Sequence, residues 1–271
     1  YRTYATYGHP TDCFMAVAAR FYDLAAPSYL GEVACGVNLT TEFRLKLRDA
    51  MGIAFALQQP MAISWSAPFV ECERKALSAA AAMIDWTEFR RAPAPVAIIV
   101  DRPDSQQVER LVRYEAALAA IPLDYEYIRP GADISRYVAV FDARQDFRKP
   151  EIGKTIPDTA VEAAPLSFTE GSHATYAVSA DRRWLLAYVR NATHYEMKLC
   201  DVGREVELCR LADRKRSLRI HVKGMAAGLE YAVLDCQSAT VVGKGRFDRG
   251  VIIELGETAD DFVLVVRPLQ H

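Results

Sequence analysis

The stretch 29–38, YLGEVACGVN, places Glu32 inside a run that is otherwise typical of a buried strand and that stops in glycine and asparagine. Burying a carboxylate without a partner costs several kcal/mol, so a chain that does this usually has a chemical use for the group or a cation beside it. A glutamate at a strand end most often caps a helix or pairs with an arginine. The residues alone leave catalysis and these structural roles open.

Other motifs that carry chemistry are absent from the sequence. It contains no G-x-S-x-G, H-E-x-x-H, P-loop or G-x-G-x-x-G pattern. The six cysteines form no C-x-x-C pair and have no zinc spacing, so we expect buried free thiols in a reducing cytoplasm. We therefore predict no metal and no cofactor. Among the five scattered histidines, only His9, in YGHPTD ahead of the first predicted helix, is placed to face a pocket.

The composition is that of an ordinary globular protein. The chain has 271 residues, 51% of them hydrophobic and 25% charged, with a net charge of -2. No window approaches the ~18 uninterrupted apolar residues of a membrane helix, so we expect no membrane partner. The basic cluster at 214–219 is short and lacks interleaved aromatics, which favours a solvated hairpin over a nucleic-acid site.

The first 92 residues alternate between helical and strand patterns. Apolar residues recur at helical spacing over 11–25, 40–60 and 73–89, and short apolar strands are predicted at 27–36 and 61–69, the second containing Trp65. This alternation is typical of parallel pairing in α/β proteins.

The rest of the chain divides into two patterns. Strands at 96–101, 124–128 and 137–143, with an amphipathic helix at 108–121, predict a small Rossmann-like unit. After a polar stretch at 150–172, short strands with period two predict an antiparallel β-sandwich, at 174–180, 184–191, 195–200, 205–211, 218–224, 230–235, 250–255 and 261–267.

Three stretches resemble a known family. They are APVAIIVDRP with RLVRYEAALAAIPLDYEYIRPGADISRYVAVFD, then GRFDRGVIIELGETADDFVLVVRP, and YLGEVACG followed by MAISWS. Together they resemble the C-terminal part of retaining (β/α)8-barrel glycoside hydrolases, nearest to the family 42 bacterial β-galactosidases. The resemblance implies the last βα units of a barrel at 1–92, a short middle domain at 93–149, a linker at 150–172 and a β-sandwich at 173–271. The chain departs from the family in its short middle domain and in having two barrel strands where a barrel needs about eight.

The resemblance also implies a function. Glu32 stands where the family has its catalytic nucleophile, at the end of barrel strand seven, and Trp65, His9 and Asn38 are the implied substrate contacts. Retaining hydrolysis needs a second, protonated carboxylate about 5 Å from the first, and no residue of this chain occupies the position expected for it. The implied partners are a carbohydrate substrate and the missing N-terminal part of the barrel.

Two further expectations follow from the same resemblance. The family's middle domain is a trimerisation element, and its shortening here predicts a weak homo-oligomer or none from this segment. The alternative function is a non-catalytic carbohydrate-binding or assembly protein that keeps remnants of the fold.

Overall fold

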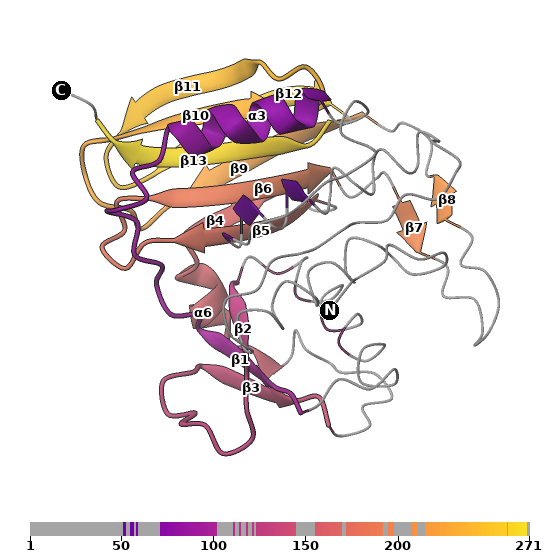
Figure 1. The fold of residues 1–271 in the computed structure, drawn as a ribbon, viewed down its shortest axis with the longest axis vertical. Coiled ribbons are helices and arrows are strands. Elements are labelled where there is room, and N and C mark those ends of the chain that lie inside the picture. Colours follow the sequence, from indigo (N-terminus) through magenta and orange to yellow (C-terminus); the bar gives the residue numbers. More distant parts are fainter. Residues whose placement is uncertain are drawn as a thin grey trace.

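In the residues that it describes, the structure, a computed structural model, consists mostly of strands in antiparallel sheets with few helices (Figure 1). It describes residues 51–52, 55–56, 58, 71–101, 111, 114, 118, 121, 123–144, 155–169, 172–191, 195–197, 208–210, 215–258 and 260–269. The predicted barrel strands at 27–36 and 61–69 lie outside these residues, so the barrel remains a prediction.

The middle of the chain forms a three-stranded parallel sheet. Strands β1 (Val96–Ile99), β2 (Tyr125–Ile128) and β3 (Ala139–Asp142) pair in the order β2-β1-β3, in the regions where the sequence predicts strands. Leu111, Tyr114 and Leu118, in the predicted helix 108–121, are helical and at most 1% exposed. They share one apolar cluster with β1 and β3. This helix face therefore packs on the sheet, as its spacing predicts.

Two antiparallel sheets and a small hairpin follow. One sheet has the strand order β11-β10-β13-β6-β5, a second has β12-β9-β4, and β7 pairs with β8. The strands are β4 (Leu166–Phe168), β5 (Ser172–Val178), β6 (Leu185–Asn191), β7 (Tyr195–Met197), β8 (Leu208–Arg210), β9 (Arg216–Val222), β10 (Leu229–Asp235), β11 (Val241–Phe247), β12 (Val251–Thr258) and β13 (Phe262–Pro268). A single cluster of buried residues from both larger sheets fills the space between them, as in a β-sandwich.

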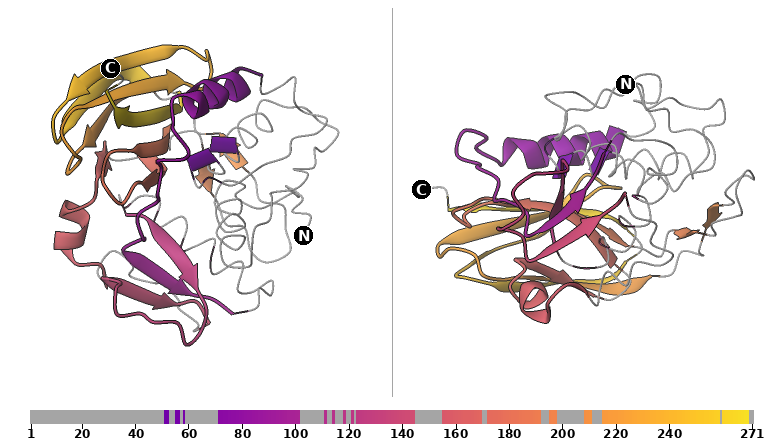
Figure 2. Two further views of the ribbon diagram at one scale, coloured as in Figure 1. Left: turned by 60° about the vertical axis from the view of Figure 1, so that its left-hand side comes forward. Right: turned by 90° about the horizontal axis from the view of Figure 1, so that it is seen from below.

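The five-stranded sheet is covered on its other face as well. Helix α3 (Glu71–Ala82) lies across that face (Figure 2) and packs through Ala76, Leu77 and Ala80. The sequence already carries the signal for this, since β6 and β13 are continuous apolar runs, which indicates burial on both faces. Helix α3 lies within the predicted barrel segment 1–92, and in the structure it contacts the sandwich.

The segment 150–172, predicted as a linker, contains regular structure. It includes α6 (Asp158–Glu162), whose Ala160 and Val161 pack against the core of the parallel sheet. It also includes β4, which pairs with β9, so the sandwich begins within the predicted linker. These elements are short and their apolar residues few, which is why no period was visible in the sequence.

Strand β11 is a third element that the sequence did not predict. It is an edge strand in which Gly243 and Gly245 alternate with exposed side chains, so it has no apolar face to produce a period of two. Gly245 lies opposite Tyr231 of β10, and the phenol ring covers it, because a Cβ atom there would lie 2.9 Å from the ring. The tyrosine thus supplies the packing that the glycine lacks.

Gly52 is a position at which substitution by alanine is expected to destabilise the protein. It is helical, and glycine to alanine in a helix normally stabilises by roughly 0.5–1 kcal/mol. Here an added Cβ would lie 2.4 Å from the ring of Tyr188, which is completely buried and donates a hydrogen bond to Asp261. We expect Gly52→Ala to lower the free energy of unfolding by about 1–3 kcal/mol, measured by urea titration.

Gly243→Ala is the matched control, because a Cβ at that position meets ordinary contacts at 3.6 Å or more. We expect the control to change stability by less than about 1 kcal/mol. A Gly52→Ala protein as stable as the parent would mean that this helix does not rest on Tyr188.

Two smaller predictions can be compared with the structure. Cys72 is a free thiol, and Cys236 is buried. In the basic cluster, Lys215 and Arg219 are exposed, and Arg219 pairs with Glu254 at 2.7 Å on the surface of the sandwich. Within the described part of the chain, no helix is both long and apolar enough to span a bilayer.

Candidate functional site

The residues predicted to form the catalytic site all lie outside the described part of the chain. This holds for Glu32 and for the three predicted substrate contacts, Trp65, His9 and Asn38. Their arrangement therefore stays a prediction.

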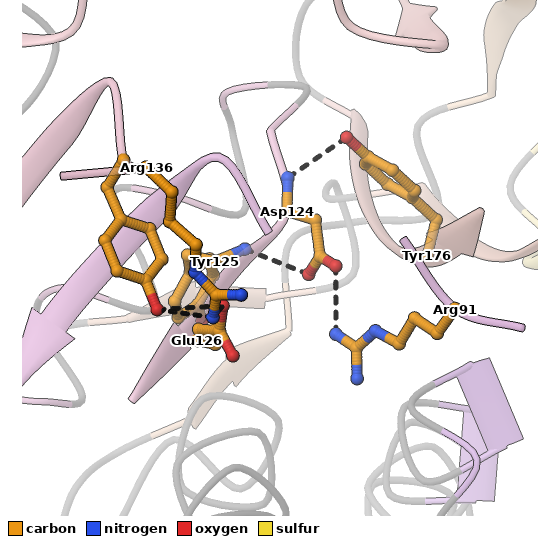
Figure 3. A network of polar contacts seen from close by, with 7 residues as sticks. Arg91, Asp124, Tyr125, Glu126, Arg136 and Tyr176 are labelled. Carbon is orange, nitrogen blue, oxygen red and sulfur yellow. Dashed lines mark hydrogen bonds and ion pairs between the residues drawn. The ribbon is translucent and has the colours of Figure 1, made fainter. Parts of the chain in front are cut away.

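A buried ion pair stands out between the parallel sheet and the sandwich (Figure 3). Arg91 Nη2 lies 2.9 Å from Asp124 Oδ2, with 24% of the arginine and 6% of the aspartate side chain exposed. The other carboxylate oxygen accepts a hydrogen bond from the backbone N–H of Tyr125, at 2.9 Å. The backbone N–H of Asp124 itself donates to the hydroxyl of Tyr176, at 3.0 Å.

Three different parts of the fold position these groups. Asp124 directly precedes β2, and Tyr176 belongs to β5 of the sandwich. Arg91 forms an isolated antiparallel bridge with Ser179, and the neighbouring Ala92 donates to the carbonyl of Val178 at 2.7 Å. The chain between α3 and β1 is thus fixed to the end of β5, which points Arg91 toward Asp124. The pair fastens the parallel sheet to the sandwich.

A second cluster lies on the surface of the parallel sheet. Arg136 donates through Nη2 to Glu126 at 2.8 Å and to the Tyr137 hydroxyl at 2.7 Å, and this hydroxyl donates to Glu126 at 3.1 Å. Burial raises the pKa of Tyr137, against the opposing effect of Arg136. The phenol is therefore a hydrogen-bond donor at neutral pH. The side chain of Arg136 is 51% exposed, so this cluster contributes little to stability.

Neither carboxylate has the properties of a catalytic acid or nucleophile. A glycosidase needs one carboxylate that can approach the anomeric carbon and another that carries a proton. Both oxygens of Asp124 accept bonds from protein donors. Glu126 already pairs with Arg136 and Tyr137. The arrangement is suited to holding the two units together, and we assign it that structural role.

A ligand site could also lie at the carboxyl ends of β1 and β3, because open parallel sheets commonly bind ligands there. Asp142, the last residue of β3, makes a two-pronged ion pair with Arg144, with Nε–Oδ1 and Nη2–Oδ2 distances of 2.8 and 2.7 Å. The hydrogen bond to Asp142 and the nearby charge of Asp101 raise the pKa of Arg144. Among the residues that the structure describes, no three His, Cys, Asp or Glu side chains are placed to hold a metal ion.

The sequence analysis did not identify Asp124 as a partner of Arg91, although a signal exists. Asp124 is a carboxylate at the edge of a buried strand, in LDYEYI, which is the pattern that drew attention to Glu32. At Asp124 the charge of the carboxylate is compensated by an arginine, Arg91. The pattern alone therefore does not separate a catalytic carboxylate from a structural one.

Comparisons with known proteins give the following result. No protein-family model and no curated protein sequence matches the chain. Among solved structures, an α-L-fucosidase, isoenzyme 2 from Paenibacillus thiaminolyticus, is similar at 10% identity and a TM-score of 0.46, over 83% of this chain and 57% of the fucosidase. A catalytic mutant of a GH42 β-galactosidase from G. stearothermophilus is similar at 10% identity and a TM-score of 0.47, over 98% of this chain and 59% of that enzyme.

This chain therefore spans less than three-fifths of the length of these glycoside hydrolases. With TM-scores of 0.46 and 0.47, neither likeness identifies the fold or the function of this chain.

Proposed function

We propose that this chain is the C-terminal part of a glycoside hydrolase that cleaves β-glycosidic bonds, with β-galactosides as the first substrates to test, by a retaining double displacement. One observation carries the proposal. The stretch 94–142, which bears the most specific part of the sequence resemblance, folds as a parallel sheet with a helix packed on it, and an antiparallel sandwich follows. This order of units is the one that the resemblance implies.

In this proposal Glu32 is the nucleophile. Its ionised carboxylate attacks the anomeric carbon, and the bond to the leaving oxygen breaks as a second carboxylic acid donates its proton to that oxygen. Water then attacks the resulting glycosyl ester, giving its proton back to the second carboxylate and freeing Glu32. The second carboxylate comes from barrel strands that this chain does not contain.

The other predicted contacts have simpler roles. Trp65, at the end of the next predicted strand, offers a flat apolar face to the sugar ring. The side chains of His9 and Asn38 can hydrogen-bond to sugar hydroxyls. Each of these three contacts would orient the ring for the attack by Glu32.

The proposal can be tested by trapping the covalent intermediate in the complete enzyme. In a 2-deoxy-2-fluoro-β-galactoside with a dinitrophenyl leaving group, the fluorine slows both steps and the good leaving group restores only the first. We expect one fluorogalactosyl group per chain by intact mass, and peptide mapping should locate it on Glu32. A label on another carboxylate, or turnover of β-galactosides by an enzyme that never becomes labelled, would contradict the assignment.

A further inference from the structure

Positive charge gathers at one end of the sandwich, the end at which β11 and β13 finish, on the left in Figure 1. Three loops meet there: 179–184 between β5 and β6, 223–228 between β9 and β10, and 248–250 between β11 and β12. We call this surface the basic end. Its cations are Arg182, Arg183, Lys223, Arg246 and Arg249, and Arg90 joins them because its carbonyl accepts the N–H of Ala180.

Backbone hydrogen bonds hold the loops together. Ala226 donates to the carbonyl of Arg182 at 3.0 Å, and Arg249 donates to the carbonyl of Ala226 at 3.3 Å. Arg182 and Arg249 both have left-handed backbone conformations, with φ of 58° and 66°. Arg182 and Arg249 are 67 residues apart in sequence, and both are thus linked to Ala226 by backbone hydrogen bonds.

The carboxylates of these loops accept hydrogen bonds from hydroxyl and backbone donors. Asp181 accepts hydrogen bonds from Ser179 Oγ and from the backbone N–H of Arg183, at 2.5 and 3.1 Å. Burial works against the charged form, but these bonds and the nearby charge of Arg183 hold the pKa of Asp181 below its ordinary value. Asp248 accepts from the backbone N–H of Gly228 at 2.6 Å. No ion pair joins any of the six cations to a carboxylate within the described residues.

The exposed arginines of the basic end suit an oxyanion. Arg183, Arg246 and Arg249 are all exposed, and guanidinium groups match carboxylate and sulfate geometry.

We propose that the basic end binds an acidic polysaccharide through its uronate or sulfate groups. The patch is compact, being formed by the three loops together with Arg246 of β11 and Arg90, whereas nucleic-acid surfaces usually extend as a stripe that follows the phosphate backbone. None of the three loops exposes an aromatic side chain for base stacking, because Trp184 is 7% exposed. This binding surface is separate from Glu32 and needs no hydrolysis.

Calorimetry on the full chain tests the proposal, with hexagalacturonate and a heparin-derived hexasaccharide as probes and neutral galactohexaose as the reference. The test variant combines Arg183→Gln, Arg246→Gln and Arg249→Asn, asparagine being chosen because it tolerates the left-handed backbone. The control variant combines Lys215→Gln and Lys244→Gln, exposed cations outside the three loops. Circular dichroism and the melting temperature check that both variants fold.

We expect at least one acidic hexasaccharide to bind and the neutral one not to bind. The affinity should fall as salt is raised, and the triple variant should lose roughly tenfold or more in affinity while the control stays within about twofold of the parent. Glu32→Gln should bind these sugars like the parent. The result for the basic end therefore does not depend on whether Glu32 is catalytic. Equal binding of the neutral sugar, an unaffected triple variant, tighter binding of a single-stranded DNA 12-mer, or no binding of either acidic probe at low salt would overturn the proposal.

Discussion

The complete enzyme carrying Glu32→Gln is expected to hydrolyse an aryl β-galactoside several orders of magnitude more slowly than the parent, while remaining folded. Glutamine keeps the shape and hydrogen-bonding capacity of the side chain. It lacks the negative charge that attacks the anomeric carbon, so the covalent intermediate cannot form. Removing a catalytic carboxylate that is held at some energetic cost should leave the melting temperature unchanged or raise it slightly.

Measuring activity and melting together separates catalysis from a structural role. If Glu32 instead neutralises a buried arginine, the substitution leaves that cation uncompensated and should destabilise by about 3–5 kcal/mol. Activity would then fall only in proportion to unfolding. Glu126→Gln is the matched control, since Glu126 lies in a surface cluster with Arg136 and should affect neither quantity strongly. Turnover by Glu32→Gln within tenfold of the parent would remove Glu32 from the catalytic assignment.

The second large effect is expected at Asp124. Asp124→Ala removes the partner of a guanidinium that is only 24% exposed and leaves the Tyr125 N–H without its acceptor. Breaking a buried pair in this way costs about 3–5 kcal/mol, whereas an exposed pair is worth about 0–1 kcal/mol. Urea titration should therefore show a large loss of stability for Asp124→Ala and a small one for Arg136→Ala, which breaks the exposed pair with Glu126.

A double variant tests whether the cost comes from the loss of this ion pair. Adding Arg91→Met to Asp124→Ala removes the guanidinium that Asp124 had balanced and places an apolar chain of similar length in its position, so part of the lost stability should return. If Asp124→Ala costs no more than Arg136→Ala, the ion pair does not fasten the parallel sheet to the sandwich. A double variant less stable than either single one would show that Arg91 contributes through contacts other than Asp124.

The sequence by itself determined most of the strands. β1, β2 and β3 form at the predicted apolar runs. All eight strands predicted for the sandwich region are present, six of them in the two larger sheets, whereas β7 and β8 form a separate hairpin. These signals are local, because a run of apolar residues with a strand period must be buried whichever neighbour covers it. The helix containing Leu111, Tyr114 and Leu118 follows for the same reason, since its spacing creates an apolar face.

Elements without such a face could not be predicted in this way. Strand β4 has three residues, and β11 alternates glycine with exposed side chains, so each is held by the strand beside it and not by its own pattern. Helix α3 was predicted as a helix, but nothing in its sequence indicates which sheet it covers. An apolar helix face specifies that it must be buried and leaves its partner open.

The polar contacts depended most on the tertiary structure. Arg91 and Asp124 are 33 residues apart, and Arg182 and Arg249 meet only because two turns each bond to Ala226. A charge can be compensated from any direction by any chain segment, so its sequence neighbours do not identify its partner. The sequence therefore identifies Glu32 as a carboxylate within an apolar run, and the same pattern occurs at Asp124. At Asp124 only the fold identified the compensating cation, Arg91, because the cost of burying a charge is decided by the groups that surround it in space.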